Sequence, residues 1–166
     1  MPRPPRGLSL IELLVAIAIV AALFGAATIA IDAAGGGRTL EREGRRFAAL
    51  VAVACERAQV TGRDYGIHVG AEGYAFSVAQ ADGWTLEGSG DLSPHSLARG
   101  VSLALSREGT AVELAEGLPD APQAACFATG ELTPFVASLS AGTLEPWQVE
   151  GAIDGAIESH ARAPAG

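Results

Sequence analysis

The sequence predicts an α+β protein in which one long N-terminal helix packs on a C-terminal antiparallel β body, with its strands arranged in two sheets. Three observations carry this prediction. An uncharged apolar run of helical length lies near the N-terminus, and a helical repeat of apolar residues continues beyond it as far as Thr61. The rest of the chain is a series of short alternating segments separated by glycine and proline turns, which is typical of antiparallel sheets. After the apolar run, the 166 residues leave room for one domain of ordinary size.

The chain begins with a short basic leader, Met1–Gly7, which contains Arg3 and Arg6. From Leu13 to Ile31 there are 19 residues without a charge, enough for about 28 Å of helix and close to the thickness of a bilayer core. A secretory signal peptide has an apolar core of only about 7–15 residues, so this run is too long for one. We expect a membrane-spanning half-helix, with the basic leader kept in the cytoplasm.

Glu12 is a carboxylate at the start of this apolar run. A charge at membrane depth costs roughly 2.5–3.5 kcal/mol on insertion scales. In one interpretation the spanning helix begins at Leu13, and Glu12 lies in the headgroup layer. In the other, Glu12 lies at membrane depth and has a use that compensates for this cost. The physics of the helix alone leaves both open.

The stretch RGLSLIELLVAIAIVAAL, which begins at Arg6, resembles the class III signal of type IV pilin-like proteins. The resemblance rests on a basic leader ending in glycine, then apolar and small hydroxyl residues, a glutamate and an uninterrupted helix. It implies that a prepilin peptidase of the membrane cuts between Gly7 and Leu8 and that the new Leu8 amine is methylated. It also implies that Glu12 faces the amine of a neighbouring subunit during assembly, so that two charges in apolar surroundings neutralise each other.

The chain departs from this family pattern in two respects. Leu8 stands where most members have phenylalanine, and Ser9 where threonine is common. No proline occurs between Pro5 and Pro94, whereas many major pilins kink this helix with one. The second difference favours a minor component of the filament.

The triple glycine Gly35–Gly37 is expected to melt or bend the helix, since glycine has a low helix propensity. Beyond it, apolar residues recur at steps of three and four, which predicts a second, amphipathic half-helix. The helix is expected to end at Thr61 and Gly62, with the glycine as a left-handed cap. The predicted apolar face comprises Leu40, Phe47, Leu50, Val51, Ala54 and Ala58. The chain is therefore divided into a leader (1–7), an apolar helix (8–34), a glycine break (35–37) and an α+β body (38–166).

After Gly62 the pattern changes to strands. DYGIHV and GYAFSVAQ flank the turn GAEG and predict a hairpin. The segments GVSLALS, TAVELA, AACFAT, PFVASLS and WQVEGAI are further predicted strands. Loops are expected over 84–96 and 115–123, and a frayed tail over 161–166.

The body also carries a resemblance, in the motifs TGRDYGI, GYAF, Trp84, LARGVSLAL and ATGELTPF in that order. Together with the leader they are similar to the H-type minor pseudopilins of type II secretion, a group that includes the FimT minor pilins. The resemblance implies a scarce subunit near the tip of a periplasmic pseudopilus that supports export of folded proteins. Its implied partners are other major and minor pseudopilins, the prepilin peptidase and the assembly platform of the bacterial inner membrane. No cofactor and no catalytic residue are implied.

Charge is unevenly distributed and bears on the nearest alternative, a FimT-like pilin in DNA uptake. The chain has no lysine, and 11 arginines stand against 19 acids. Six arginines and three acids lie between Arg38 and Arg63, whereas Asp64–Gly166 holds three arginines and fourteen acids. DNA-binding relatives have a basic C-terminal patch, but the tail ESHARAPAG offers only Arg162. Nucleic acid is therefore not expected as a partner.

Cys55 and Cys126 are the only cysteines. If the body faces an oxidising periplasm, they can form a disulfide between helix and sheet. The alternative is two buried thiols that pack as small apolar groups. Sequence does not give their distance, so both alternatives stay open.

A more distant alternative is a membrane-anchored periplasmic hydrolase. Asp91, Ser93, His95 and Ser96 lie together in one segment, but triads are assembled in space, and a solvated loop is the better interpretation. The scattered histidines, His68, His95 and His160, lack zinc-site spacing. Asp82, Glu87, Asp91 and Asp120 could supply oxygen ligands to calcium, but they lack the spacing of a defined loop, so no metal site is predicted.

Overall fold

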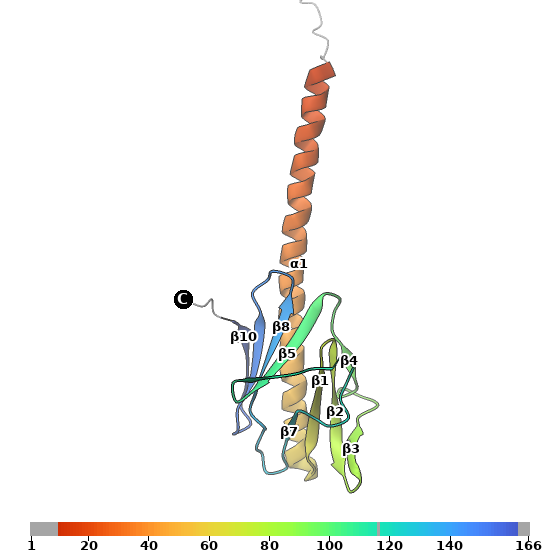
Figure 1. Cartoon of the computed structure of the whole chain (residues 1–166), viewed down its shortest axis with the longest axis vertical. Helices are drawn as coiled ribbons and strands as arrows, with labels where there is room; N and C mark the ends of the chain where they lie inside the picture. The colour runs from red at the N-terminus through yellow and green to blue at the C-terminus, as the bar shows by residue number, and fades with distance from the viewer. Residues whose placement is uncertain (1–9, 116, 163–166) are drawn as a thin grey trace, which may run out of the picture. The chain divides into compact units, whose positions relative to one another are not determined.

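The structure is a computed structural model that describes residues 10–115 and 117–162. One helix, α1 (Leu10–Thr61), is followed by ten strands (Figure 1). The chain divides into two compact units, Met1–Gly36 and Gly37–Gly166, and this boundary lies within the predicted glycine break. Helical structure nevertheless continues through Gly35–Gly37. The predicted melting of the helix is therefore wrong, and a bend there stays a prediction.

The strands of the second unit form two antiparallel sheets. In the first, the order is β3-β2-β1-β7, and β4 also pairs with β2. Its strands are β1 (Tyr65–Gly70), β2 (Gly73–Gln80), β3 (Gly83–Leu86), β4 (His95–Ser96) and β7 (Ala124–Cys126). In the second, the order is β10-β9-β8-β5-β6. Its strands are β5 (Val101–Arg107), β6 (Thr110–Val112), β8 (Phe135–Ala141), β9 (Trp147–Gly151) and β10 (Ile157–Ala161). The predicted α+β class with two sheets is confirmed.

The C-terminal half of α1 forms the core of this unit together with both sheets. Its buried residues repeat the predicted stripe: Leu40, Phe47, Val51, Ala54 and Ala58 are at most 2% exposed, and only Leu50 is half-buried. The Phe47 ring lies 4.7 Å from the Tyr74 ring of β2 and 6.1 Å from the Phe135 ring of β8. One side chain of the helix therefore contacts both sheets, which explains why the amphipathic period persists to the end of α1.

The end of α1 is as predicted. Gly62 has a φ of +67°, and its N–H donates to the Ala58 carbonyl at 3.0 Å. An L-residue rarely adopts this conformation, so glycine stabilises the exit of the chain toward β1. Two residues on, the Asp64 carboxylate accepts a hydrogen bond from the Ala128 N–H at 2.8 Å, which joins this exit to the ATGELTPF segment.

Three strands were not predicted. β3 and β4 lie within 84–96 or at its edge, where a loop was expected, and β10 includes Ala161 of the expected tail. β3 is exposed along its whole length, and β10 is exposed or half-buried. These strands are held by backbone pairing with β2 and β9. They bury no alternating face, so the sequence lacks the periodic signal by which strands are recognised.

Candidate assembly surface and processing site

The predicted processing site, Gly7 and Leu8, lies outside the described residues. Glu12 lies in the first turns of α1, but its side chain is not among those described. Cleavage after Gly7, methylation of Leu8 and an assembly role for Glu12 therefore stay predictions.

The described part of the first unit presents an apolar helix surface. Seven large side chains are 50–71% exposed: Ile11, Leu13, Leu14, Val15, Ile17, Ile19 and Val20. Removing apolar surface from water is worth roughly 25 cal/mol per Å², so this segment is stabilised by an apolar environment outside its own chain. Within the part of the chain that the structure describes, no helix combines the length and apolarity needed to cross a membrane.

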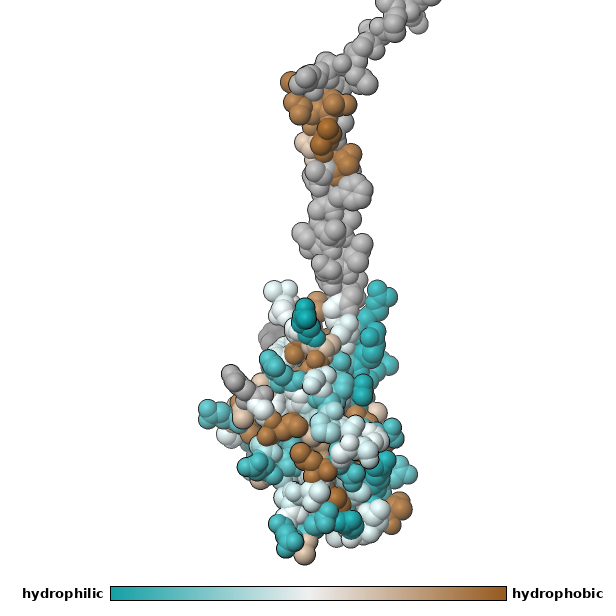
Figure 2. Space-filling model, turned by 90° about the vertical axis from the view of Figure 1, so that its right-hand side faces the viewer, coloured by the Kyte–Doolittle hydropathy of each residue, from teal (hydrophilic) through white to brown (hydrophobic). Residues whose placement is uncertain are grey.

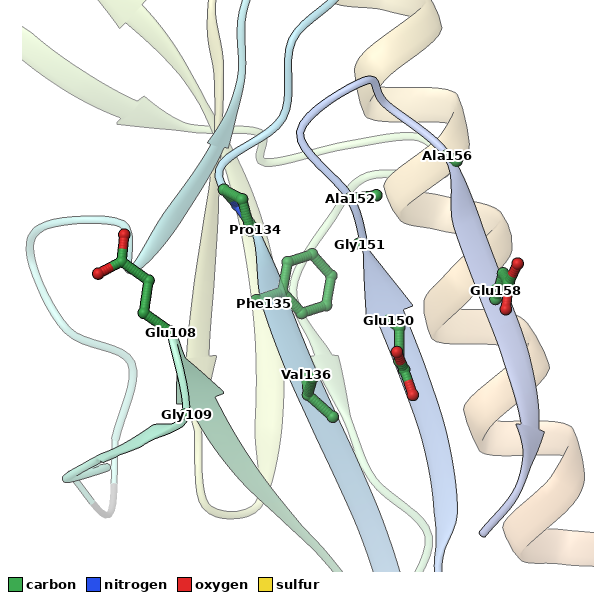
Figure 3. Close-up of a pocket in the computed structure, with 10 residues that line it drawn as sticks. All are labelled: Glu108, Gly109, Pro134, Phe135, Val136, Glu150, Gly151, Ala152, Ala156 and Glu158. Carbon is green, nitrogen blue, oxygen red and sulfur yellow. The ribbon is translucent and has the colours of Figure 1, made fainter. Parts of the chain in front are cut away.

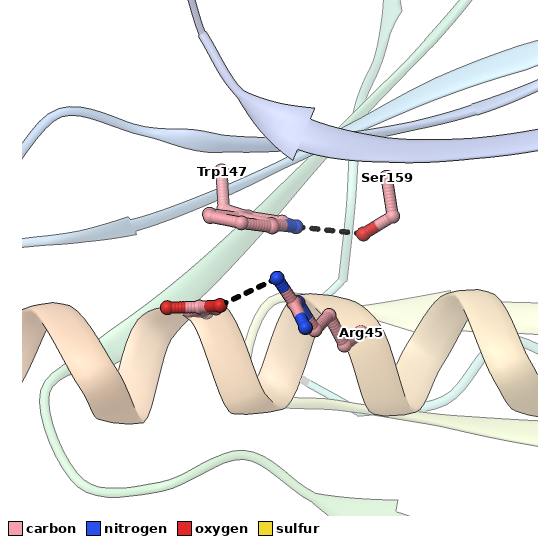
Figure 4. A network of polar contacts seen from close by, with 4 residues as sticks. Arg45, Trp147 and Ser159 are labelled. Carbon is pink, nitrogen blue, oxygen red and sulfur yellow. Dashed lines mark hydrogen bonds and ion pairs between the residues drawn. The ribbon is translucent and has the colours of Figure 1, made fainter.

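A close contact between α1 and β9 fixes the second sheet on the helix (Figure 4). Gly44 is buried, and a Cβ there would collide with the Trp147 indole. The indole N–H donates to the Ser159 hydroxyl at 2.7 Å, and the Arg45 guanidinium lies 5.8 Å from the ring centroid. Sequence reasoning did not identify this site, although its signal is present: Gly44 lies between Leu40 and Phe47 on the apolar stripe.

A second polar contact joins α1 to the segment before β5. Glu43 and His95 lie 2.9 Å apart between Oε2 and Nε2, and their side chains are 14% and 16% exposed. The His95 ring lies 5.1 Å from the ring of Tyr74, which is fully buried. Burial raises the pKa of the Tyr74 hydroxyl above its ordinary value of 10.0, while the nearby Arg46 guanidinium opposes this effect. The contact of Glu43 with His95 thus attaches β4 to the helix, and the sequence did not indicate this pair.

His68 and Ser77 form the hydrogen-bonded serine and histidine pair that a hydrolase would need, but they are buried. His68 Nε2 lies 2.7 Å from the Ser77 hydroxyl and Nδ1 lies 2.8 Å from the Pro119 carbonyl, and the two residues are 1% and 0% exposed. Burial lowers the pKa of His68, which favours a neutral ring that donates to the carbonyl and accepts from the hydroxyl. This arrangement attaches the 117–123 segment to the first sheet and gives no substrate access to the serine.

The residues considered for a catalytic triad do not converge. His95 contacts Glu43, the Ser93 hydroxyl donates to the Gly90 carbonyl at 2.8 Å, and Asp91 lies 3.9 Å from Arg57. His160 lies 3.6 Å from Glu150, far in sequence from the others. Among the described residues, no group of three or more His, Cys, Asp or Glu side chains is placed to hold a metal ion. The four acids considered for calcium are thus not brought together.

The structure joins Cys55 of α1 and Cys126 of β7 in a disulfide. Both residues are buried, and they are separated by 71 positions in the chain. The side-chain amide of Gln123, just before β7, exchanges two hydrogen bonds with the backbone of Val69, at 2.8 and 2.7 Å. The short strand β7 is therefore attached covalently to the helix and by hydrogen bonds to β1.

An acidic hollow of about 400 Å³ opens on the second sheet (Figure 3). Three carboxylates line it, from Glu108, Glu150 and Glu158, beside Phe135 and Val136. Its lining contains no serine, cysteine, histidine or lysine, so the hollow has neither a nucleophile nor a general base other than carboxylate. Its three carboxylates contribute to the negative charge of the second unit. On the face of this unit in Figure 2, hydrophilic and near-neutral residues surround small apolar patches.

The chain is similar to a known N-terminal motif and to known type II secretion proteins. The prokaryotic N-terminal methylation motif matches residues 3–28. Type II secretion system protein H of Pseudomonas aeruginosa is 30% identical over 142 residues, which cover 80% of this chain and 81% of that protein. The protein of the same name from Aeromonas hydrophila is 30% identical over 146 residues, covering 81% of this chain and 80% of its own length.

Solved structures show the same fold. The crystal structure of the minor pseudopilin EpsH from the type II secretion system of Vibrio cholerae superposes with a TM-score of 0.66 at 23% identity, covering 78% of this chain and 98% of that one. The solution structure of Escherichia coli GspH gives a TM-score of 0.58 at 20% identity, with coverage of 78% and 94%. The chain thus combines the N-terminal methylation motif with the pseudopilin fold. It belongs to the type II secretion system protein H family, the H-type minor pseudopilins.

Proposed function

We propose that this chain is a minor subunit of a type II secretion pseudopilus, assembled near its tip to support export of folded proteins. It is inserted in the inner membrane with the leader in the cytoplasm and residues 38–166 in the periplasm. A prepilin peptidase then removes residues 1–7, and the Leu8 amine is methylated. Its partners are other major and minor pseudopilins and the inner-membrane assembly platform. As a member of a structural family it is not an enzyme, so the hydrolase alternative is wrong.

One observation carries this proposal. The methylation motif over 3–28 overlaps the start of α1, where seven large apolar side chains between Ile11 and Val20 are at least half exposed, and the same helix continues into a folded α+β unit. A helix with such an apolar surface needs lipid or neighbouring helices around it. The membrane supplies lipid before assembly, and the filament then supplies neighbouring helices. Glu12 then has a use, because a carboxylate in apolar surroundings is tolerated when a positive amine pairs with it.

Substitution of Gly7 tests the processing step. Gly7→Leu should leave an uncut precursor in the inner membrane, because the peptidase needs a residue without a side chain beside the scissile bond. Amino-terminal sequencing of the wild-type protein should begin at methylated Leu8. A start at Met1, or at a residue after Ala27, would contradict the prepilin assignment.

Substitution of Glu12 tests the assembly step. Glu12→Ala should still insert, since a charge is removed from membrane depth. Crosslinking of the subunit into filaments and secretion of substrate enzymes should both fall. Normal crosslinking and normal secretion would return Glu12 to the headgroup interpretation. Scoring a deletion strain for secreted enzyme activity and for transformation separates the secretion role from a DNA-uptake role.

A further inference from the structure

We infer that the exposed face of α1 over residues 38–46 binds the phosphate headgroups of anionic phospholipids at the membrane surface. We call this face the basic stripe, and it comprises Arg38, Arg42, Arg45 and Arg46. The inference rests on the proposed function, which places the preceding apolar segment in the bilayer before assembly.

The four arginines of the stripe lie together on one face of the helix. These arginines and Glu41 line an open hollow of about 520 Å³. Arg38, Arg42 and Arg46 follow one another at steps of four, so their side chains start from one side of α1. All four arginines are exposed. A phosphate group within reach of this face can accept hydrogen bonds from more than one guanidinium.

The neighbouring acids Glu41 and Glu43 pair with groups other than Arg42 and Arg46. Glu41 pairs with Arg45 at 2.7 Å, and Glu43 is turned to His95 in a half-buried contact. Among the described residues, Arg42 and Arg46 have no carboxylate within ion-pair distance. Like charges four residues apart destabilise a helix by a few tenths of a kcal/mol, so the stripe gains from an external anion.

The stripe also opposes the charge bias that orients membrane helices. Arginine and lysine near the ends of a spanning helix favour the cytoplasmic side. The leader has two arginines, whereas four lie in the stripe on the side proposed to be periplasmic. Because these four arginines oppose insertion in the proposed orientation, we expect them to have a function on the periplasmic side.

Its position in the chain indicates lipid as the occupant. Arg38 follows Ile31 by only seven residues in the sequence, so chain connectivity alone keeps the start of the stripe within about 25 Å of the end of the apolar run. Residues 64–166 hold fourteen acids and three arginines, so an anionic surface repels the remainder of the body. The stripe is therefore the part of the folded unit that such a surface attracts.

Trp147 is a natural reporter, because its ring lies beside Arg45. The full chain carrying Trp84→Phe, with Trp147 as its only tryptophan, is reconstituted in vesicles of phosphatidylcholine alone or mixed with phosphatidylglycerol. Both contain a trace of phosphatidylcholine with a nitroxide on its headgroup, which quenches nearby indole fluorescence. Quenching should be stronger in the anionic vesicles and should weaken at high salt. Arg42→Gln/Arg46→Gln should lower quenching in the anionic vesicles to the level seen in phosphatidylcholine alone. Loss of one arginine lowers the ratio of lipid-bound to released stripe about fivefold, so loss of two lowers it about 25-fold.

Arg57→Gln/Arg63→Gln is the matched control, with one arginine removed near the C-terminal end of α1 and one just beyond that end, and it should quench like the parent. Arg42→Gln alone, an exposed change away from Trp147, should give an intermediate value if the double variant unfolds. Equal quenching in both vesicles, or quenching unchanged by the stripe variants, would overturn the inference. Stripe variants that keep the quenching of the parent but lose their crosslinks to neighbouring subunits would also overturn the inference. The group bound to the stripe would then be an acidic protein surface. Release of the full chain by an alkaline carbonate wash would instead contradict the proposed membrane insertion.

Discussion

At the scale of single residues, the absence of a side chain at Gly44 positions the second sheet on the helix. The Trp147 indole occupies the space that a Cβ would need, and its N–H is satisfied by Ser159. Glycine costs about 1 kcal/mol relative to alanine in a helix interior. The contact with the half-buried Trp147 ring offsets that cost, because aromatic side chains bury a large apolar area.

Gly44→Ala should therefore destabilise the protein, even though alanine is the better helix former. Overpacking a well-filled site typically costs 1–3 kcal/mol, which outweighs the gain in helix propensity of about 1 kcal/mol. Urea unfolding followed by Trp147 fluorescence, with Trp84→Phe in all proteins compared, measures the change. Gly37→Ala is the control, because a Cβ at Gly37 has nothing within 4 Å, and it should stabilise the helix. A stabilised Gly44→Ala variant would contradict the packing described for Trp147.

His68 should make stability depend on pH. Burial lowers its pKa below 6.5, so on acidification the unfolded chain takes up a proton at this site before the folded chain does. The contribution of His68 to stability is complete above about pH 6.5 and is lost as pH falls toward the lower folded pKa, by at most about 1.4 kcal/mol per pH unit. His68→Gln should unfold with a smaller difference between pH 7.5 and 5.5 than the parent. Titrating carboxylates affect both proteins alike, and equal pH dependence of the two would disprove the role of His68.

At the scale of elements, the short strand β7 depends on contacts beyond its own pairing. Its three residues pair with β1, Cys126 is bonded to α1, and Gln123 attaches the preceding segment to Val69. Three residues of backbone pairing give little stability by themselves, since isolated short strands are marginal. The helix and the first sheet are thus held together at β7 by a covalent bond.

Loss of this bond should lower the free energy of unfolding by a few kcal/mol. A bridge that closes a loop of 71 residues removes about 4 kcal/mol of chain entropy from the unfolded state in the loop-closure treatment. Urea unfolding of the oxidised protein, compared with the same protein after reduction and with Cys55→Ala/Cys126→Ala, measures the effect with and without the sulfur atoms. Two thiols that react with a labelling reagent in protein isolated from an oxidising compartment would contradict the bridge.

At the scale of the whole molecule, charge separates the amphipathic half-helix from the β body. Residues 38–166 carry nine arginines and seventeen acids, and six of the nine arginines lie between Arg38 and Arg63. If the chain is inserted in the membrane as proposed, the basic stripe is close to lipid, and weak contacts of single arginines suffice there. A ligand free in solution has to overcome the field of the acidic body first.

DNA should therefore bind weakly. Residues 38–166 should bind duplex DNA no more tightly than the non-specific range of about 10⁻⁴–10⁻⁶ M at physiological salt, because phosphates are repelled by the body and contacted by few arginines. Fluorescence anisotropy with a labelled duplex measures this. Submicromolar, salt-sensitive binding that is lost with Arg162 or the arginines of the stripe would favour a role in DNA uptake.

The sequence by itself determined the elements whose side chains alternate between two environments. The apolar stripe from Leu40 to Ala58, the cap at Gly62 and the hairpin of β1 and β2 were predicted correctly, because burial imposes a period that is local in sequence. The ordered leader, glycine and glutamate indicated the family for a similar reason, since the matching motif is contained in one local segment, residues 3–28.

Only the tertiary structure decided the contacts between distant segments. The exposed strands β3 and β10 exist through pairing with a neighbour, and no pattern in their own residues marks them. The partners of Cys55, Glu43 and Gly44 lie 71, 52 and more than 100 positions away. Such pairs depend on how two sheets pack on one helix, because distance along the chain carries no information about distance in space. A local signal can also fail. The low helix propensity of Gly35–Gly37 predicted melting, but the helix continues through these residues.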